Sequence, residues 1–141
     1  MSVKGAQERI TQAVTAWNGV TVQPHRFGGV EYVIGRREIG HIHGDQLVDI
    51  AFPKKIRDEL VAAGRAEPHH IFPATGWVSF YLQQDDDVGK AIELLHENFV
   101  IAMRQNQKHN FATYPPNPLD LGDMSVRKVD FTFALIRAPC N

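Results

Sequence analysis

The sequence predicts an α+β fold, in which an antiparallel sheet of five or six strands has helices packed on one face. Apolar residues follow a helical period near both ends of the first hundred residues. Between these regions, short β-rich segments are separated by turns of a few residues, and such short connections are typical of antiparallel strands. The chain has 141 residues, 43% of them hydrophobic and 22% charged, which is the size and composition of one globular domain.

The N-terminal half is predicted to form a helix, a meander of strands and a second helix. Residues 5–17 place Ile10, Val14 and Trp17 on one helical face. A second helix begins after Pro53 and ends near Gly64, which are favourable residues for those two positions. The strands expected between the helices are 20–23, 27–34, 37–43 and 46–52.

The C-terminal half is predicted to add one strand, the longest helix and a final strand. Residues 77–83 alternate as a strand, and apolar residues then recur at helical spacing over 88–103. Residues 106–123 are expected to form an irregular loop, and 124–137 a strand that rejoins the sheet. This pattern predicts a single domain over 1–141, with its core at about residues 5–105.

Charge and cysteine content narrow the function classes. The formal net charge is −1, so the basic excess typical of a nucleic-acid partner is missing. Cys140 is the only cysteine, which excludes an intrachain disulfide. The sequence contains neither a signal-peptide pattern nor a run of about 18 apolar residues, so we expect a cytoplasmic protein without a membrane partner.

Five of the seven histidines lie between residues 25 and 70, and they are the most unusual feature of the sequence. They are His25, His41, His43, His69 and His70. His41 and His43 are two residues apart, so on a strand both imidazoles leave the same face, about 7 Å apart. Such a pair predicts a divalent metal site. The candidates for a further ligand are His70, Glu67 and Asp49.

The length of the turn after His43 determines which residues of the next strand pair with His41 and His43, and two alternatives are open. A two-residue turn at Gly44 and Asp45, which the glycine favours, places His41 opposite Val48 and Asp49 on the other face. A three-residue loop places Asp49 opposite His41, which gives a carboxylate–imidazole pair suited to acid–base chemistry. A structural role for both histidines, as hydrogen-bonded residues at the edge of the core, is a third interpretation.

The function predicted from these residues is binding of a small molecule or a peptide segment. The expected pocket is lined by His41, His43, His70 and Trp77, with Arg37 near its mouth. Because successive residues of an extended chain point to opposite sides, only one of His69 and His70 is expected to join the pocket.

Two other function classes remain open. One is an enzyme that uses the histidines around a metal or as acid–base groups. The other is an interaction scaffold that uses residues 114–118, where prolines disfavour regular structure. A small sheet with exposed edges also permits a homodimer.

Several blocks of the sequence, in order, resemble the domain family labelled luciferase in bacteria and fungi. The blocks are the W-x-G-V run from Trp17, then residues 24–29, 37–50, 53–70 and 75–80. The resemblance spans about residues 15–100 and implies the fold, while it supplies no agreed substrate or catalytic residues. The order of helix, meander, helix, strand and long helix is also similar to MmcQ/YjbR-like α+β domains.

Overall fold

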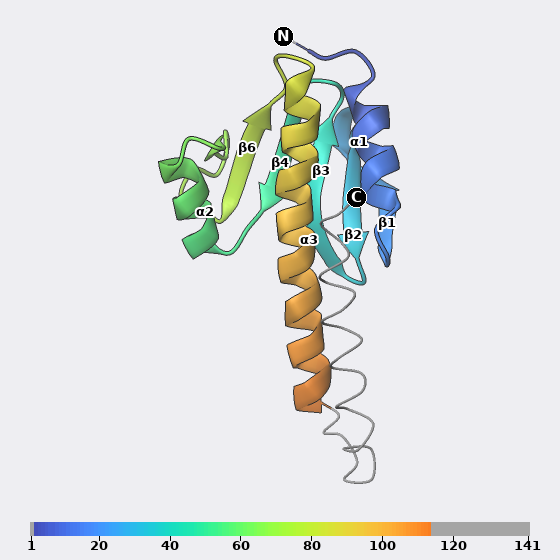
Figure 1. The fold of residues 1–141 in the computed structure, drawn as a ribbon, viewed down its shortest axis with the longest axis vertical. Coiled ribbons are helices and arrows are strands. Elements are labelled where there is room, and N and C mark those ends of the chain that lie inside the picture. The colour runs from blue at the N-terminus through green and yellow to red at the C-terminus, as the bar shows by residue number, and fades with distance from the viewer. Residues whose placement is uncertain (1, 114–141) are drawn as a thin grey trace. The chain divides into compact units, whose positions relative to one another are not determined.

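A computed structural model describes residues 2–113 (Figure 1). The chain divides into two units, Met1–Arg104 and Gln105–Asn141, and the sheet belongs to the first. The elements in chain order are α1 (Ala6–Thr15), β1 (Val20–Pro24), the short 3-10 helix η1 (Arg26–Gly28), β2 (Val30–Ile34), β3 (Arg37–His43), β4 (Leu47–Ala51), α2 (Lys54–Ala62), β5 (Glu67–Pro68), β6 (Trp77–Tyr81) and α3 (Asp86–Thr113).

The six strands form one antiparallel sheet in the order β1-β2-β3-β4-β6-β5. This architecture confirms the predicted α+β class and the strand count. Strand β5 was not among the predicted strands, because two residues are too few to show a period. In the structure, Glu67 and Pro68 pair with Ser79 and Val78 of β6.

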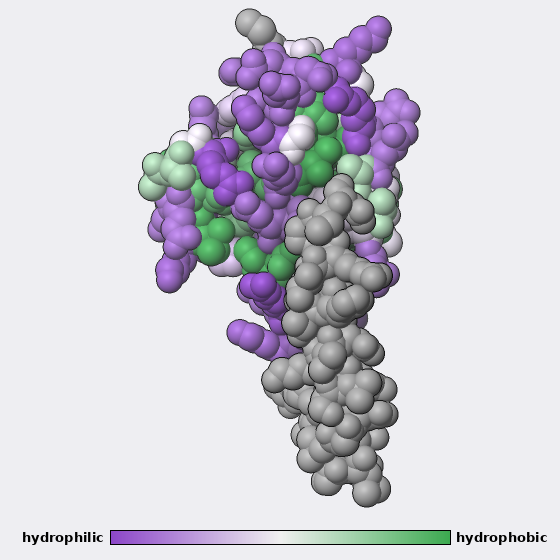
Figure 2. Space-filling model, viewed as in Figure 1, coloured by the Kyte–Doolittle hydropathy of each residue, from purple (hydrophilic) through white to green (hydrophobic). Residues whose placement is uncertain are grey.

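Helices α1 and α3 lie against the same face of the sheet (Figure 1). Thr11 of α1 is hydrogen-bonded to the hydroxyl of buried Tyr32 on β2, at 2.8 Å. Gly40 of β3 lets α3 approach closely, because a Cβ at this position would lie 2.8 Å from Leu95 Cδ2. Figure 2 views this helix-covered side, where hydrophobic residues are visible between hydrophilic ones.

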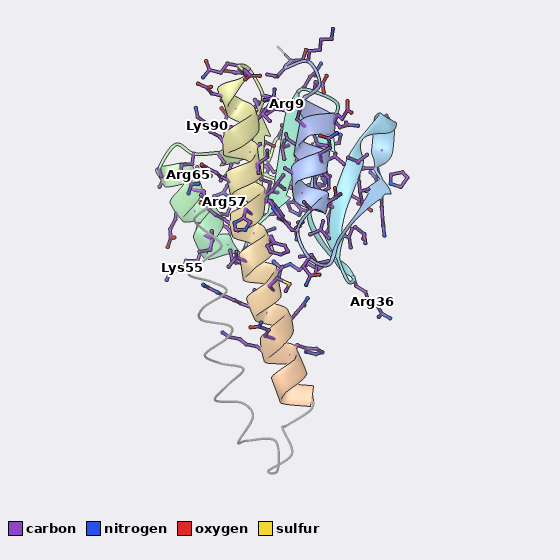
Figure 3. The ribbon with its side chains drawn as sticks, turned by 45° about the vertical axis from the view of Figure 1, so that its right-hand side comes forward. Arg9, Arg36, Lys55, Arg57, Arg65 and Lys90 are labelled. Atoms are coloured by element: carbon purple, nitrogen blue, oxygen red, sulfur yellow. The ribbon has the colours of Figure 1, made fainter. Side chains whose placement is uncertain are left out.

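An ion pair connects the end of the α2 region to α3. Arg65, just beyond the end of α2 (Figure 3), contacts Glu97 of α3 at 2.7 Å. Both side chains are largely exposed, so the pair contributes little to stability. Helix α2 itself is anchored in the core by Leu60, which is buried.

Helix α3 is longer than the apolar period predicted. It continues to Thr113, so residues 106–113 are helical where the sequence suggested a loop. The physical reason is that the segment contains neither glycine nor proline before Pro115, and a polar helix end leaves no apolar period to detect. The segment 114–118 and the strand expected at 124–137 lie outside the described residues.

The β3–β4 connection has three residues, and the favoured two-residue turn was wrong. His43 pairs with Leu47, and His41 therefore pairs with Asp49. The cause is a distant partner: the carboxylate of Asp45 accepts the backbone N–H groups of Gly5 and Gln7 at 3.0 and 2.9 Å. A turn residue engaged by the first turn of α1 cannot be recognised from local turn preferences alone.

Candidate functional site

A row of polar side chains crosses the sheet on the face turned away from α1 and α3. Gly40 faces α3, so its neighbour His41 faces the other way. Cross-strand pairing then aligns the row in the order Glu31, His41, Asp49, Ser79 and Glu67. Apolar residues are usual inside a sheet, so a continuous polar row indicates a site rather than a packing surface.

Asp49 is the centre of this row and has no exposed surface. Its Oδ1 accepts a hydrogen bond from the Ser79 hydroxyl at 2.6 Å. Its Oδ2 lies 3.3, 3.4 and 3.5 Å from the Nε2 atoms of His41, His43 and His69. Among the described residues, no hydrogen bond of good geometry reaches Oδ2. A buried carboxylate oxygen ringed by imidazoles is therefore available to a further partner.

A β-bulge brings a second carboxylate to His41. Tyr32 pairs with Gly40 and Val33 with Glu38, which leaves Ile39 as the extra residue of β3. The extra residue turns Glu38 to the same face as His41, and Glu38 Oε1 lies 2.5 Å from His41 Nδ1. The freed carbonyl of Ile39 accepts a hydrogen bond from the Asn98 side chain at 2.7 Å, inside the core.

His25 joins from the loop between β1 and β2. Its ring stacks on that of His41, with centroids 4.0 Å apart and planes 17° apart. Its Nδ1 lies 3.3 Å from Glu31 Oε2. One ring nitrogen each of His25, His41 and His43 lies within 4.8 Å of the others. Two of the three imidazoles thus have a carboxylate at Nδ1 and leave Nε2 for another partner.

His69 and His70 both reach Asp49, and the expectation that only one of them joins was wrong. His69 Nε2 is 3.5 Å from Oδ2, and His70 Nδ1 is 3.7 Å from Oδ1. The two residues follow β5, where the chain is no longer extended, so the alternation of a strand does not apply. Their rings stack with centroids 4.4 Å apart. All five histidines of this region therefore form one group, the histidine cluster.

The hydrogen bonds of His69 fix its protonation. The backbone N–H groups of Ile71 and Phe72 donate to His69 Nδ1 at 3.1 and 3.0 Å. A nitrogen that accepts carries no proton, so the neutral ring holds its proton on Nε2, toward Asp49. The Nε2 proton of His69 therefore lies on the side of Asp49, and this nitrogen is not available as a metal ligand.

Burial and neighbouring charges shift the pKa values of the cluster residues in different directions. Burial lowers the pKa of His41, but the carboxylates of Asp49 and Glu38 outweigh it and raise the pKa to about 9. Burial lowers the pKa of His43, with a contribution from the charge of His41, and burial also lowers the pKa of His69. Burial raises the pKa of Asp49, but the interactions with His41 and with the Ser79 hydroxyl outweigh it and hold this pKa below its usual value. At neutral pH the cluster therefore combines an Asp49 carboxylate and a protonated His41 with neutral His43 and His69.

Most of the residues that the sequence predicted for the pocket lie in or beside the histidine cluster, and one lies away from it. His41, His43 and His70 lie at Asp49, and Trp77 contacts His41 at a centroid distance of 5.2 Å. Arg37 is the first residue of β3, at the opposite end of the strand from His43. Two surface hollows among the described residues lie away from the cluster, between α2 and α3 and beside α1, whereas a third, beside β6 and α3, is lined in part by Ser79 and Glu67 of the polar row.

The sequence analysis did not predict roles for Glu31, Glu38 or Ser79. Their contribution depends on register and on the bulge, which place them beside histidines from other strands. Correct strand pairing would have revealed Glu31 and Ser79, since both stand in the row through His41 and Asp49. Glu38 required the bulge, for which the sequence carries no local signal apart from the neighbouring Gly40.

Comparison with known proteins shows similarity to one family over part of the chain. None of the described helices combines the length and apolar character needed to cross a bilayer. No curated protein and no solved structure matches the chain. Residues 36–98 match the family model described as Luciferase domain, and this segment contains His41, His43, Asp49, His69 and His70. Over residues 36–98 the chain is therefore similar to the Luciferase domain family.

Proposed function

We propose that this domain binds one divalent transition-metal ion through His25, His41 and His43, with the Asp49 carboxylate as a further donor. The observation that carries the proposal is the convergence of three ring nitrogens within 4.8 Å beside a buried carboxylate oxygen to which no described residue donates a well-aligned hydrogen bond. Bonds of about 2 Å place the donor atoms of a tetrahedral ion about 3.3 Å apart. The separations of Asp49 Oδ2 from His41 Nε2 and His43 Nε2 are 3.3 and 3.4 Å.

The partners of the imidazoles support the same proposal. A histidine that binds a metal usually donates its other ring N–H to a carboxylate or carbonyl, which fixes the ring and its tautomer. Glu31 and Glu38 stand in this position at the Nδ1 atoms of His25 and His41. In this arrangement an ion would bind the Nε2 atoms of both rings, and at His41 it would displace the proton that this ring carries at neutral pH.

The formal charges of the site favour a cation. Asp49, Glu31 and Glu38 supply three carboxyl groups, and the imidazoles are the basic groups that face them. Imidazole and carboxylate donors suit zinc, iron, cobalt, nickel and copper. The side chain of His43 is 30% exposed, so an ion at this position is accessible to solvent and to an external ligand, as catalytic metal sites require.

The experiment is metal analysis of protein produced without a histidine tag. After equilibrium dialysis against zinc, we expect about one ion per parent chain. His41→Ala and His43→Ala should weaken zinc binding by more than the 10–100-fold typical of an outer-shell residue. His96→Ala is the matched control, because His96 is exposed on α3 and its ring contacts Trp17 instead of the cluster.

Two outcomes would overturn the proposal. One is a folded parent protein that holds no stoichiometric zinc. The other is a doubly substituted protein, lacking His41 and His43, that binds zinc as tightly as the parent. Because His41 is buried, circular dichroism should accompany each variant. His25→Gln, in a loop outside the strands, provides a substitution with less effect on folding.

Direct binding of a small molecule or a peptide segment at the histidine cluster is the second candidate. It is supported by the partial exposure of His43 and His70, 30% and 33% of their side chains. A bound ligand that survives treatment with EDTA would favour this candidate, whereas a ligand released with the ion would favour the metal site.

A further inference from the structure

Exposed apolar side chains stand on the same two loops that carry histidines of the cluster. Phe27 is 98% exposed and follows His25 by two residues. Ile71 and Phe72 are 63% and 57% exposed and directly follow His70. Large apolar residues exposed beside a polar site are a recognised mark of a binding surface. We call these three side chains the apolar rim.

Phe27 is held in a conformation that a bulky residue rarely adopts. Its φ is 58°, in the left-handed region, and among the described residues it is the only one other than glycine with a positive φ. The loop is closed around it by a hydrogen bond from the His25 N–H to the Gly29 carbonyl at 2.9 Å. Such strain, combined with full exposure, gives no folding benefit and therefore indicates a functional constraint.

A chain of ring contacts connects the two sides of the rim across the cluster. The ring of Phe72 lies 5.5 Å from that of His69, which lies 5.8 Å from that of Trp77. Trp77 in turn lies 5.2 Å from His41, and His41 stacks on His25 at 4.0 Å. The rings thus form a continuous series of contacts from the loop of Phe72 to the loop of Phe27. This series includes His41 and His25, two of the proposed metal ligands.

The charges select among the partners that such a surface can bind. A wholly apolar partner would cover the partly exposed carboxylates of Glu31 and Glu38 without hydrating them, which is unfavourable. An anionic lipid surface would meet the same carboxylates. A small molecule with one metal-coordinating head and an apolar body satisfies both parts, because the head reaches the ion and the body covers the rings.

We infer that the ligand of this site is such a molecule, with its polar head on the metal and its apolar body against Phe27, Phe72 and Trp77. The inference rests on the proposed metal site and adds the chemical class of its ligand. It assigns a binding role to the exposed phenylalanines, which the fold itself does not require.

The test compares two hydroxamates on the zinc-loaded full chain by isothermal titration calorimetry. Octanohydroxamate and acetohydroxamate share the zinc-binding head and differ in the apolar tail. Burial of the tail should make the octanoyl probe bind at least about tenfold more tightly. Phe27→Ser and Phe72→Ser should each reduce this ratio several-fold, leaving the affinity for acetohydroxamate and the zinc content unchanged.

Val22→Ser is the matched control, because Val22 is an exposed apolar residue paired with Tyr32, on the face that α1 covers. It should leave the ratio as in the parent. Equal affinity for the two probes on zinc-loaded protein would overturn the inference while the metal site stands. A chain that takes up no zinc would overturn both, and metal analysis before the titration distinguishes the two failures.

Discussion

Asp49 is the residue on which the charges of the cluster depend. Its carboxylate is buried and faces His41, whose pKa it helps to raise. Loss of one partner leaves a buried charge uncompensated, so Asp49→Asn should lower the free energy of unfolding by about 3 kcal/mol in EDTA-treated protein. Urea denaturation at pH 7 measures the change.

The control for this substitution is an exposed carboxylate that also belongs to an ion pair. Asp58 contacts Lys54 at 2.6 Å on the surface of α2, where solvent screens the interaction. Asp58→Asn should leave stability nearly unchanged. If the Asp49 and Asp58 variants unfolded at the same urea concentration, the central role of Asp49 would be refuted.

At the same scale, the sequence identified part of the site. The spacing of His41 and His43 predicted their common face because the period of a strand is a local property. The partners of His25 and His69 could not be predicted in this way. His25 meets His41 through a loop, and His69 is oriented by backbone groups of Ile71 and Phe72, so both depend on tertiary structure.

The bulge of β3 orients Glu38 toward His41, and Asn98 of α3 stabilises this bulge. Asn98 is fully buried and donates to the freed carbonyl of Ile39. Asn98→Ala should lower the free energy of unfolding by about 1–3 kcal/mol, since it leaves a buried carbonyl unpaired. It should also weaken zinc binding several-fold, because Glu38 loses its alignment with His41.

Both effects can be measured by urea denaturation and by competition with a zinc-binding dye. Asn106→Ala, at an exposed position further along α3, serves as the control and should change neither quantity. A variant at Asn98 that is less stable but binds zinc like the parent would show that the bulge does not orient Glu38.

Among the elements, the sequence predicted the helices and strands that have a periodic apolar pattern. It did not predict the length of a loop that is set by one tertiary contact. The period of two located β2, β3, β4 and β6, and the helical period located α1 and α2. The β3–β4 loop was assigned the wrong length because Asp45 is engaged by the first turn of α1. This single interaction shifts the register by one pairing and brings Asp49 to the face of His41.

At the scale of the whole molecule, the α+β architecture followed from the order of periodic segments. The polar row did not, since its members come from five different strands and no single strand shows which residues are their cross-strand neighbours. Only the assembled sheet shows that Glu31, His41, Asp49 and Ser79 are neighbours. The fold was thus largely encoded in local patterns, whereas the site arises from strand order and register.

Tyr32 couples the packing of α1 on the sheet to pH. Burial raises its pKa to about 12, although the hydrogen bond with Thr11 acts in the opposite direction. The folded protein therefore holds this proton more tightly than the unfolded chain, whose tyrosine pKa is about 10. The resulting stability is complete below pH 10 and is lost as the pH rises toward 12, by on the order of 2 to 3 kcal/mol. Tyr32→Phe should remove this alkaline loss, so urea denaturation of parent and variant between pH 8 and about 11.5 should give curves that converge, and parallel curves would contradict the prediction.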